Sequence, residues 1–287
     1  MKKHYPFLLA FVLLTSLSFA QQKSPYTIFD SKGKKVSYKK FIKKIKGNDV
    51  VLFGEYHNNP ISHWMQIELL KELHQEGAIT LGAEMFERDN QEQLNQYLSG
   101  EIDAKALDTL ARLWPNYKTD YAPIVDYAKA NDIPLIATNI PRRFASMVNR
   151  EGGFEALESL SDEEKSWIAP LPVEFDAELP QYKAMFEMMA GHGGSIDMVK
   201  AQAIKDATMA YSILENYSED QTFLHLHGSF HSDFYEGILW YLQQASPDLA
   251  YGTIATVEQE DISKLEEEHL GRADFILCVD SDMTKSY

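Results

Sequence analysis

Two short motifs each place a histidine three residues after a glycine. GEYH (54–57) closes the apolar run 49–55, and GSFH (228–231) follows the apolar run 221–228. Short apolar runs of this kind predict buried parallel strands, and a helix is predicted after each motif. Glycine allows a sharp turn, so each histidine is expected above a strand end, where open α/β sheets bind their ligands. Two such motifs in the same context predict one shared site.

Carboxylates stand at the same level of the predicted sheet. Glu55 lies inside the first motif, and Glu84 closes the second predicted strand. One interpretation is structural: these carboxylates cap neighbouring helix N-termini or pair with Arg142. The other is functional: a divalent metal site for an ion such as Zn, Mn or Fe, or an acid-base site without metal. The functional site would use the two glutamates and two histidines together, namely Glu55, His57, Glu84 and His231.

Further histidines lie inside the run 221–228. His225 and His227 alternate with leucines there, so both are expected on the same face of a strand. Buried histidines in this position are more often hydrogen-bonded core residues than ligands. The alternative is that His227 joins the strand-end group.

A third glycine-flanked histidine, His192 in GHGG (191–194), interrupts a helical stretch between methionine-rich segments. A histidine-bearing loop beside apolar surface suits haem or another flat hydrophobic ligand. A solvent-exposed histidine in a loop between helices is the equally simple alternative. Tyr121 is either a core residue at a helix start or an axial tyrosinate, and its spacing does not decide between these roles.

The elements that must position these residues alternate between strands and helices. Strands are predicted at 49–55, 78–86, 133–140, 221–228, 253–258 and 273–280. Helices are predicted in the lysine-rich segment and at 62–76, 89–98, 104–114, 121–131 and 232–244. A helical, acidic insertion at about 143–215 is expected to form a cap or subdomain. This alternation predicts one α/β domain over residues 21–287, with a mainly parallel central sheet flanked by helices.

Charge is unevenly distributed along the chain. The net charge of −16 argues against a general nucleic-acid partner, because phosphate binding needs a positive field. Residues 32–46 nevertheless hold eight lysines and no acidic residue. The simpler interpretation is a solvated amphipathic helix. The alternative is a patch that meets ligand carboxylates or makes a weak contact with a membrane surface through Lys32–Lys46.

The first twenty residues have the features of a cleavable secretory signal. Two lysines precede an apolar run, and small residues precede Gln21. The apolar run is too short for a comfortable membrane span. Cys278 is the single cysteine, so no cysteine beside the cleavage site is present to carry a lipid. We therefore expect an exported protein, periplasmic or secreted, without a lipid anchor.

At these motifs the sequence resembles the haem-binding uptake family called ChaN, within the Tiki-like superfamily that also includes erythromycin esterase and TraB-type proteins. The resemblance rests on GEYHNNP (54–60), GAEMFERDNQ (82–91), ATNIPRR (137–143), AQAIKDATMA (201–210) and HGSFH (227–231), which occur in the family's order. It implies an α/β fold, export and a part in haem or iron uptake. It also implies haem ligation by tyrosine and histidine, and a homodimer in which two haems stack between subunits. The uptake partner is not implied.

The resemblance also implies roles for single residues. The superfamily's two Gly-x-x-His motifs fall on His57 and His231, and its strand-end carboxylates fall on Glu55 and Glu84. The candidates for haem binding are Tyr121, His192 and Arg142. Two functions stay open at this point. One is an exported haem-binding protein of haem or iron uptake. The other is a divalent-metal-dependent hydrolase of the Tiki or erythromycin-esterase type, in which the ion lowers the pKa of a bound water and a glutamate acts as base.

Overall fold

The computed structural model describes residues 23–190 and 194–287. The predicted signal peptide (1–20) and His192 lie outside the described residues. Within the described residues, no helix combines the length and the apolar character that crossing a membrane requires.

Seven strands form a single sheet, as the α/β interpretation predicts. Their order is β1-β7-β6-β2-β5-β3-β4, and all neighbours are parallel except β1 and β7. The strands are β1 (Tyr26–Asp30), β2 (Val50–Glu55), β3 (Ile79–Glu87), β4 (Leu135–Asn139), β5 (Thr222–Gly228), β6 (Tyr251–Gln259) and β7 (Phe275–Asp280). The six predicted strands are confirmed. Strand β1 was not predicted, because it is a five-residue edge strand with only two buried residues, Ile28 and Phe29, and so gives a weak pattern.

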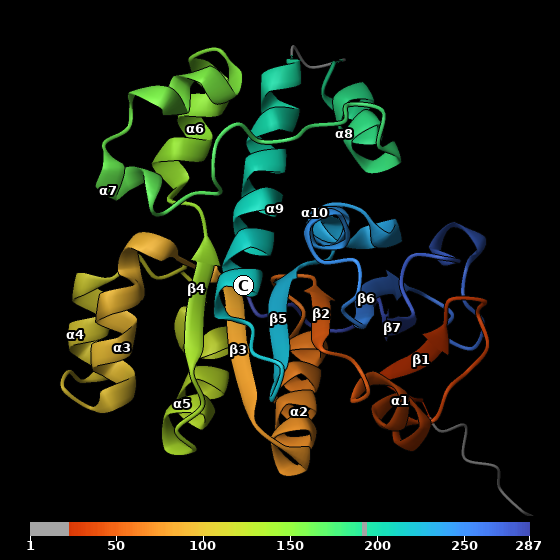
Figure 1. The fold of residues 1–287 in the computed structure, drawn as a ribbon. Helices are drawn as coiled ribbons and strands as arrows, with labels where there is room; N and C mark the ends of the chain where they lie inside the picture. The colour runs from red at the N-terminus through yellow and green to blue at the C-terminus, as the bar shows by residue number, and fades with distance from the viewer. Residues whose placement is uncertain (1–22, 191–193) are drawn as a thin grey trace, which may run out of the picture.

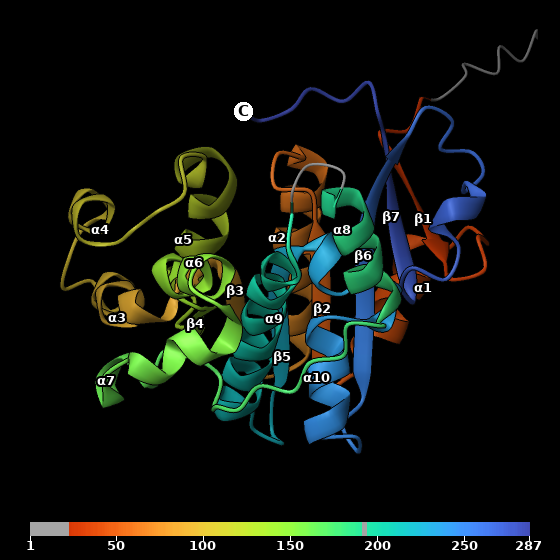
Figure 2. The same cartoon turned by 90° about the horizontal axis from the view of Figure 1, so that it is seen from above.

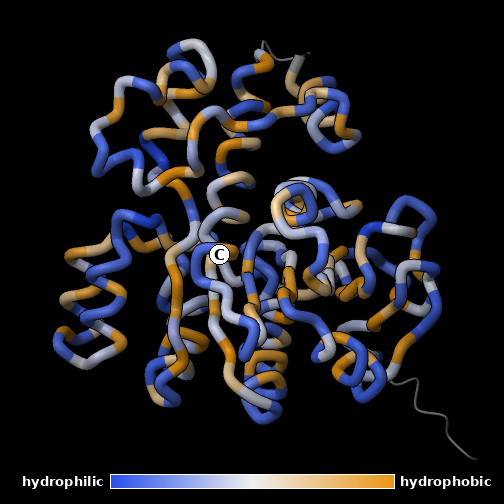
Figure 3. The backbone as a smooth tube through the Cα atoms, in the orientation of Figure 1, coloured by the Kyte–Doolittle hydropathy of each residue, from blue (hydrophilic) through white to orange (hydrophobic). Residues whose placement is uncertain are grey.

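Helices cover both faces of this sheet (Figures 1 and 2). They are α1 (Tyr38–Ile45), α2 (Pro60–Glu76), α3 (Gln91–Ser99), α4 (Ala104–Leu110), α5 (Ala122–Ala130), α6 (Arg142–Arg150), α7 (Asp162–Lys165), α8 (Pro180–Ala190), α9 (Ile196–Asn216) and α10 (Ile238–Ala245). Along their length the helices alternate between hydrophilic and hydrophobic residues, as helices packed on one side do (Figure 3).

The two faces of β2 belong to two different cores. Val51 and Phe53 pack in the cluster that holds α2 and α5. Val50 and Leu52 pack in the cluster that holds α9 and α10. This alternation follows from the two-residue period of a strand. Helix α2, which follows β2, and helix α10, which follows β5, therefore lie on opposite faces of the sheet.

Strands β2 and β5 are neighbours, and Glu55 is in register with Gly228. Because their following helices leave to opposite faces, the carboxyl ends of β2 and β5 form a switch point of the sheet. Open α/β sheets bind ligands in the crevice at such a point. The two Gly-x-x-His motifs begin at this place.

The ends of several elements differ from the predicted ones. Helix α2 begins at Pro60 rather than at residue 62, because the Asn59 side chain accepts hydrogen bonds from the first free backbone N–H groups and proline suits the first helical position. The helix predicted at 232–244 is correct only from Ile238 onward. Before it, Phe234, Tyr235 and Gly237 have positive φ, which an α-helix excludes, and short 3₁₀ turns take its place.

The helical insertion divides into two parts. Helix α9 lies on the sheet, with Met209 and Ile213 in the same core as α10. Helices α6, α7 and α8 stand further from the sheet around the far part of α9 (Figure 1). Helix α6 is held there by a separate apolar cluster that joins Phe144 and Val148 to Ile204 of α9. The cap therefore consists of α6 to α8 alone.

Candidate functional site

The two motif glycines allow close approach rather than a special turn. A Cβ atom on Gly54 would lie 2.7 Å from the Cα of Ser229, and one on Gly228 would lie 2.8 Å from Nε2 of His57. Gly228 has φ −63°, an ordinary value for any residue. The sharp turn predicted from glycine's freedom is therefore not its role at this position. A larger residue at either glycine would push the two loops apart, and with them the two motifs.

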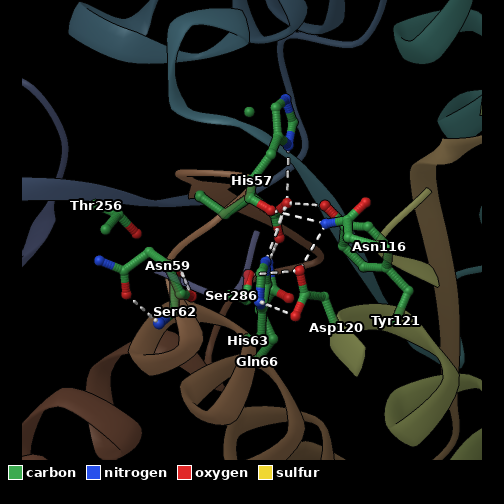
Figure 4. A network of polar contacts seen from close by, with 12 residues as sticks. His57, Asn59, Ser62, His63, Gln66, Asn116, Asp120, Tyr121, Thr256 and Ser286 are labelled. Atoms are coloured by element: carbon green, nitrogen blue, oxygen red, sulfur yellow. Dashed lines mark hydrogen bonds and ion pairs between the residues drawn. The ribbon is translucent and has the colours of Figure 1, made fainter. Parts of the chain in front are cut away.

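Glu55 is hydrogen-bonded to three members of the polar network labelled in Figure 4, namely His57, Gln66 and Tyr121. The side chain is fully buried, and its Oε1 accepts hydrogen bonds from Tyr121 Oη at 2.7 Å and from His57 Nδ1 at 2.8 Å. Oε2 accepts from Gln66 Nε2 at 2.6 Å. Burial raises the pKa of Glu55, but hydrogen bonds from His57 and His63 outweigh it and bring the pKa to about 2. Glu55 is thus an anion held in a fixed orientation.

His57 is the member of this network that faces outward. Its side chain is 33% exposed, and its ring extends away from the other labelled residues in Figure 4. Because Nδ1 is engaged by Glu55, Nε2 is the atom directed to the space above Gly228. Burial lowers the pKa of His57, but the hydrogen bond to Glu55 and the nearby charge of Glu84 raise it above its ordinary value. A carboxylate behind one ring nitrogen is the usual support of a metal-ligating histidine.

A second layer of polar residues lies behind Glu55. Asn116 donates to Asp120 Oδ2 at 2.6 Å and to the backbone carbonyl of His57 at 2.9 Å. Asp120 also accepts from the hydroxyl of Ser286 at 2.7 Å. The C-terminal segment therefore crosses the carboxyl edge of the sheet towards α5 (Figure 2). Asp120 and Tyr121 both belong to a five-residue π-helical turn, Tyr117–Tyr121, a kind of turn frequent at functional sites.

His231 is held between two buried carboxylates. Its Nε2 lies 3.2 Å from Glu84 Oε1, and its Nδ1 contacts Asp206. The other carboxylate oxygens have partners as well, because Glu84 accepts from the backbone N–H of Gly228 and Asp206 accepts from Tyr182 Oη, each at 2.7 Å. Burial lowers the pKa of His231, but Glu84 and Asp206 raise it to about 10. His231 is therefore a buried cation at neutral pH.

The stacked pair His225 and His227 lies within β5 beneath these groups. His227 shares a hydrogen bond with the hydroxyl of Ser232 at 2.7 Å, and His225 shares one with Thr138 at 2.8 Å. The two rings are joined by their Nδ1 atoms at 3.1 Å. Burial lowers the pKa of His227 to about 3 and that of His225 well below its ordinary value. Both histidines are neutral core residues, as the simpler interpretation predicts.

Because this histidine pair is buried in the neutral form, it makes the free energy of unfolding of the protein depend on pH. His227 takes up a proton near pH 6.5 when unfolded but only near pH 3 when folded, so the unfolded state binds more protons between these values. The resulting stabilisation is complete above pH 6.5 and is lost as the pH falls. We expect the free energy of unfolding to fall by about 2 kcal/mol between pH 7 and pH 5 through His227 alone. Urea unfolding of the wild type and of the control variant His227→Asn at both pH values checks this. The same decrease in the free energy of unfolding from pH 7 to pH 5 in both proteins would contradict it.

A cavity of about 660 Å³ opens above the two motifs. Its volume lies within the range typical of small-molecule sites. His57, His231 and Gln202 line its floor together with apolar or aromatic side chains and one arginine, namely Tyr56, Met185, Phe230, Tyr287 and Arg272. Arg272 donates to Asp233 Oδ2 at 2.6 Å, while its buried Nε has no hydrogen-bond partner. The cavity thus combines apolar and aromatic side chains, an imidazole nitrogen and a guanidinium, and the carboxylates of Glu55 and Asp233 also line it.

The structure brings together only some of the residues singled out from the sequence. Both glutamates and both motif histidines gather at the ends of β2, β3 and β5. Tyr121 lies beside them, but it is 1% exposed and turns its hydroxyl inward to Glu55. Burial and the charge of Glu55 raise the pKa of Tyr121 far above its ordinary value, which opposes a tyrosinate. Arg142 is exposed at the start of α6 and does not line the cavity, whereas the unpredicted Arg272 does.

The pairing of Glu84 with Arg142, one of the structural interpretations, does not occur, because His231 and the Gly228 N–H take that place. Sequence patterns did not single out Asp206, Asn116, Asp120 or Ser286. For Asp206 alone a signal was available, because it stands next to Lys205 on a helix whose neighbouring positions Ile204 and Ala207 are apolar. The others become site residues only through long-range contacts.

Metal donors are not gathered around one point at the strand ends. Across residues 23–190 and 194–287, one group of three histidine and carboxylate side chains has ligand atoms within 4.8 Å of one another, and it is Glu266, Glu268 and His269. At the strand ends, the same residue types form hydrogen-bonded histidine–carboxylate pairs instead.

Comparison with known proteins identifies relatives of this site. Residues 41–242 match the family described as "Haem-binding uptake, Tiki superfamily, ChaN". The fold is similar to a structure described as cofacial haem binding to ChaN of Campylobacter jejuni, with a TM-score of 0.67 and 18% identity over 89% of this chain and 97% of that one. It is also similar to a succinoglycan biosynthesis protein, with a TM-score of 0.50 and 14% identity over 89% and 94% of the two chains. At these identities the likeness shows the fold.

A curated relative is Protein RETICULATA-RELATED 5, chloroplastic, of Arabidopsis thaliana. It is 27% identical over 140 residues, which cover 46% of this chain and 18% of that protein. The chain therefore spans less than a fifth of this relative's length.

Proposed function

Because the chain belongs to the haem-binding uptake family ChaN of the Tiki superfamily, we propose that it binds haem in the cavity above the ends of β2 and β5. The observation that carries this proposal is the outward Nε2 of His57, whose Nδ1 is fixed by the buried anion Glu55. Histidine is a common axial ligand of haem iron, and a carboxylate behind it fixes the ring orientation. His57 would hold the iron, and Glu55 would orient His57.

The remainder of the cavity fits the other parts of a haem. A porphyrin is flat and apolar, and Tyr56, Phe230 and Met185 offer it aromatic and apolar surface. Its propionates need cations or N–H donors. Arg272 lines the cavity with a partly exposed guanidinium, so its N–H groups other than the Nη1 that bonds Asp233 can donate to a carboxylate. When bound, haem would supply the iron centre, while these residues position it and exclude water.

The wider role that we propose is supported by the family and by the predicted signal segment. The family's description names uptake, and the structure of Campylobacter jejuni ChaN is described as binding haem cofacially. We propose that this protein acts outside the cytoplasm in haem or iron uptake, with a second copy as the partner that stacked haems would require. Metal-dependent hydrolysis has less support, because Glu84, His231 and Asp206 neutralise one another rather than leaving free donors around one point.

The test is an absorbance titration of the purified protein with haemin, followed by size-exclusion chromatography of the loaded protein. We expect a saturable Soret band and a stoichiometric complex at micromolar haemin. Linear, unsaturated absorbance at these concentrations would contradict the proposal. Elemental analysis of the untreated protein accompanies it, because stoichiometric divalent metal without haem binding would favour the hydrolase.

A further inference from the structure

A second group of metal-binding side chains lies outside the proposed haem site. Glu266, Glu268 and His269 occupy one short segment before β7, around the 3₁₀ turn Glu267–His269. Each offers a ligand atom, and these atoms lie within 4.8 Å of one another. The two carboxylates are exposed, and no described residue forms a hydrogen bond or ion pair with either of them.

His269 gives this group a second, independent feature. Unlike the carboxylates, it is buried, with 7% of the residue exposed. Its Nδ1 is completely buried and has no hydrogen-bond partner among the described residues. A buried polar atom without a partner costs about 1–3 kcal/mol, so it calls for a partner that the protein itself does not supply. His227, by contrast, has both ring nitrogens in hydrogen bonds.

The backbone holds the segment in place from several sides. The N–H of Glu266 donates to Gln259 Oε1 at 3.2 Å, and the N–H of His269 donates to the carbonyl of Glu266 at 3.1 Å. The N–H of Gly271 donates to the backbone carbonyl of Ser31 at 2.8 Å. The backbone that carries His269 is therefore held in place, whereas the two exposed carboxylates can rotate towards a ligand.

We propose that Glu266, Glu268 and His269 bind a divalent first-row transition metal ion, for which Zn²⁺ is the probe. One imidazole and two carboxylates are a donor set that suits such ions, and three protein ligands leave further positions to water. The two carboxylates supply the charge that balances the cation. Arg272, a residue of the haem cavity, is separated from this site along the chain by Leu270 and Gly271 only. None of the three proposed ligands lines the haem cavity, so the site is separate from it.

The experiment is isothermal titration of the full chain with Zn²⁺, repeated on single variants. We expect Glu268→Gln and His269→Ala to weaken one Zn²⁺ site by at least about tenfold. Glu267→Gln removes the same charge from the residue between them and serves as the matched control, with affinity unchanged within about twofold. The exposed position of Glu268 makes its variant informative even if loss of His269 disturbs the fold.

A Co²⁺ absorbance spectrum separates this site from the strand-end histidines. Intensity lost in His269→Ala and retained in His57→Ala supports the assignment. Equal Zn²⁺ affinity of wild type, Glu268→Gln and Glu267→Gln would overturn it, as would loss of the site in His57→Ala alone. Haemin titration of the same variants distinguishes failure of the metal-site proposal from failure of the proposed haem binding. The Glu268→Gln protein should lose Zn²⁺ affinity but still bind haem.

Discussion

A His57→Ala protein is expected to bind haemin at least about tenfold more weakly than the wild type and to show a displaced Soret maximum. The reason is that Nε2 of His57 is the imidazole atom that faces the cavity with its other nitrogen already engaged, while His231 is enclosed between Glu84 and Asp206. Loss of an oriented ligand removes both the bond to iron and its fixed direction. The measurement is a haemin titration followed at the Soret band.

Two further variants make this result specific. His74→Ala, the same chemical change on α2 away from the cavity, should leave haemin affinity unchanged. Glu55→Gln keeps the shape of the side chain but removes the charge that orients His57, so we expect a loss of about 10–100-fold and a changed Soret position. A His57→Ala protein with the affinity and spectrum of the wild type would show that another residue holds the iron.

Most of the fold could be predicted from sequence patterns because the central strands are buried on both faces. Strand β2 begins with four apolar residues, and β5 alternates apolar residues with histidine; a glycine at the end of each run adds to this local signal. The edge strand β1 and the 3₁₀ turns before α10 carry no such signal. Their form depends on pairing with β7 in the one case and on positive φ values near Gly237 in the other.

The candidate site was predictable to the extent that its residues lie at strand ends. Glu55, His57, Glu84 and His231 follow from strand position alone, since carboxyl ends of parallel strands share an edge. Asp206 and Arg272 could not be found in this way, because α9 and the segment before β7 reach the site only through the packing of the whole domain. Tyr121 was singled out as either a core residue or a haem ligand, and its spacing could not decide between them, because the direction of a tyrosine hydroxyl is decided by its partner, here Glu55.

The same packing explains why His269 carried no sequence signal. A histidine that follows three glutamates in a turn is typical of a solvated loop, and only the structure shows that it is buried with an unpartnered nitrogen. Burial of single polar residues is thus the property that the sequence conveys least.

The largest effect on stability is expected for His231→Ala. This change leaves Glu84 and Asp206 buried without the cation between them, although each keeps one hydrogen-bond donor, Gly228 N–H for Glu84 and Tyr182 for Asp206. Removing one partner of a buried ion pair costs about 3–5 kcal/mol, because the remaining charge is uncompensated. Urea unfolding at pH 7 should show this loss with little change in the denaturant slope.

The pH dependence of this loss identifies its cause. In the wild type, the pKa of Glu84 is held below its ordinary value, against the effect of burial, chiefly by His231. Its stabilising contribution is therefore present above about pH 4.5 and is lost as the pH falls through the folded pKa. Below about pH 5.5, where His231 is protonated in the folded and the unfolded chain alike, the difference between wild type and His231→Ala should shrink, because protonated carboxyls no longer need a cation. A loss that stays constant from about pH 5.5 to pH 4 would instead mean that the imidazole contributes by packing, as a cavity-forming substitution would.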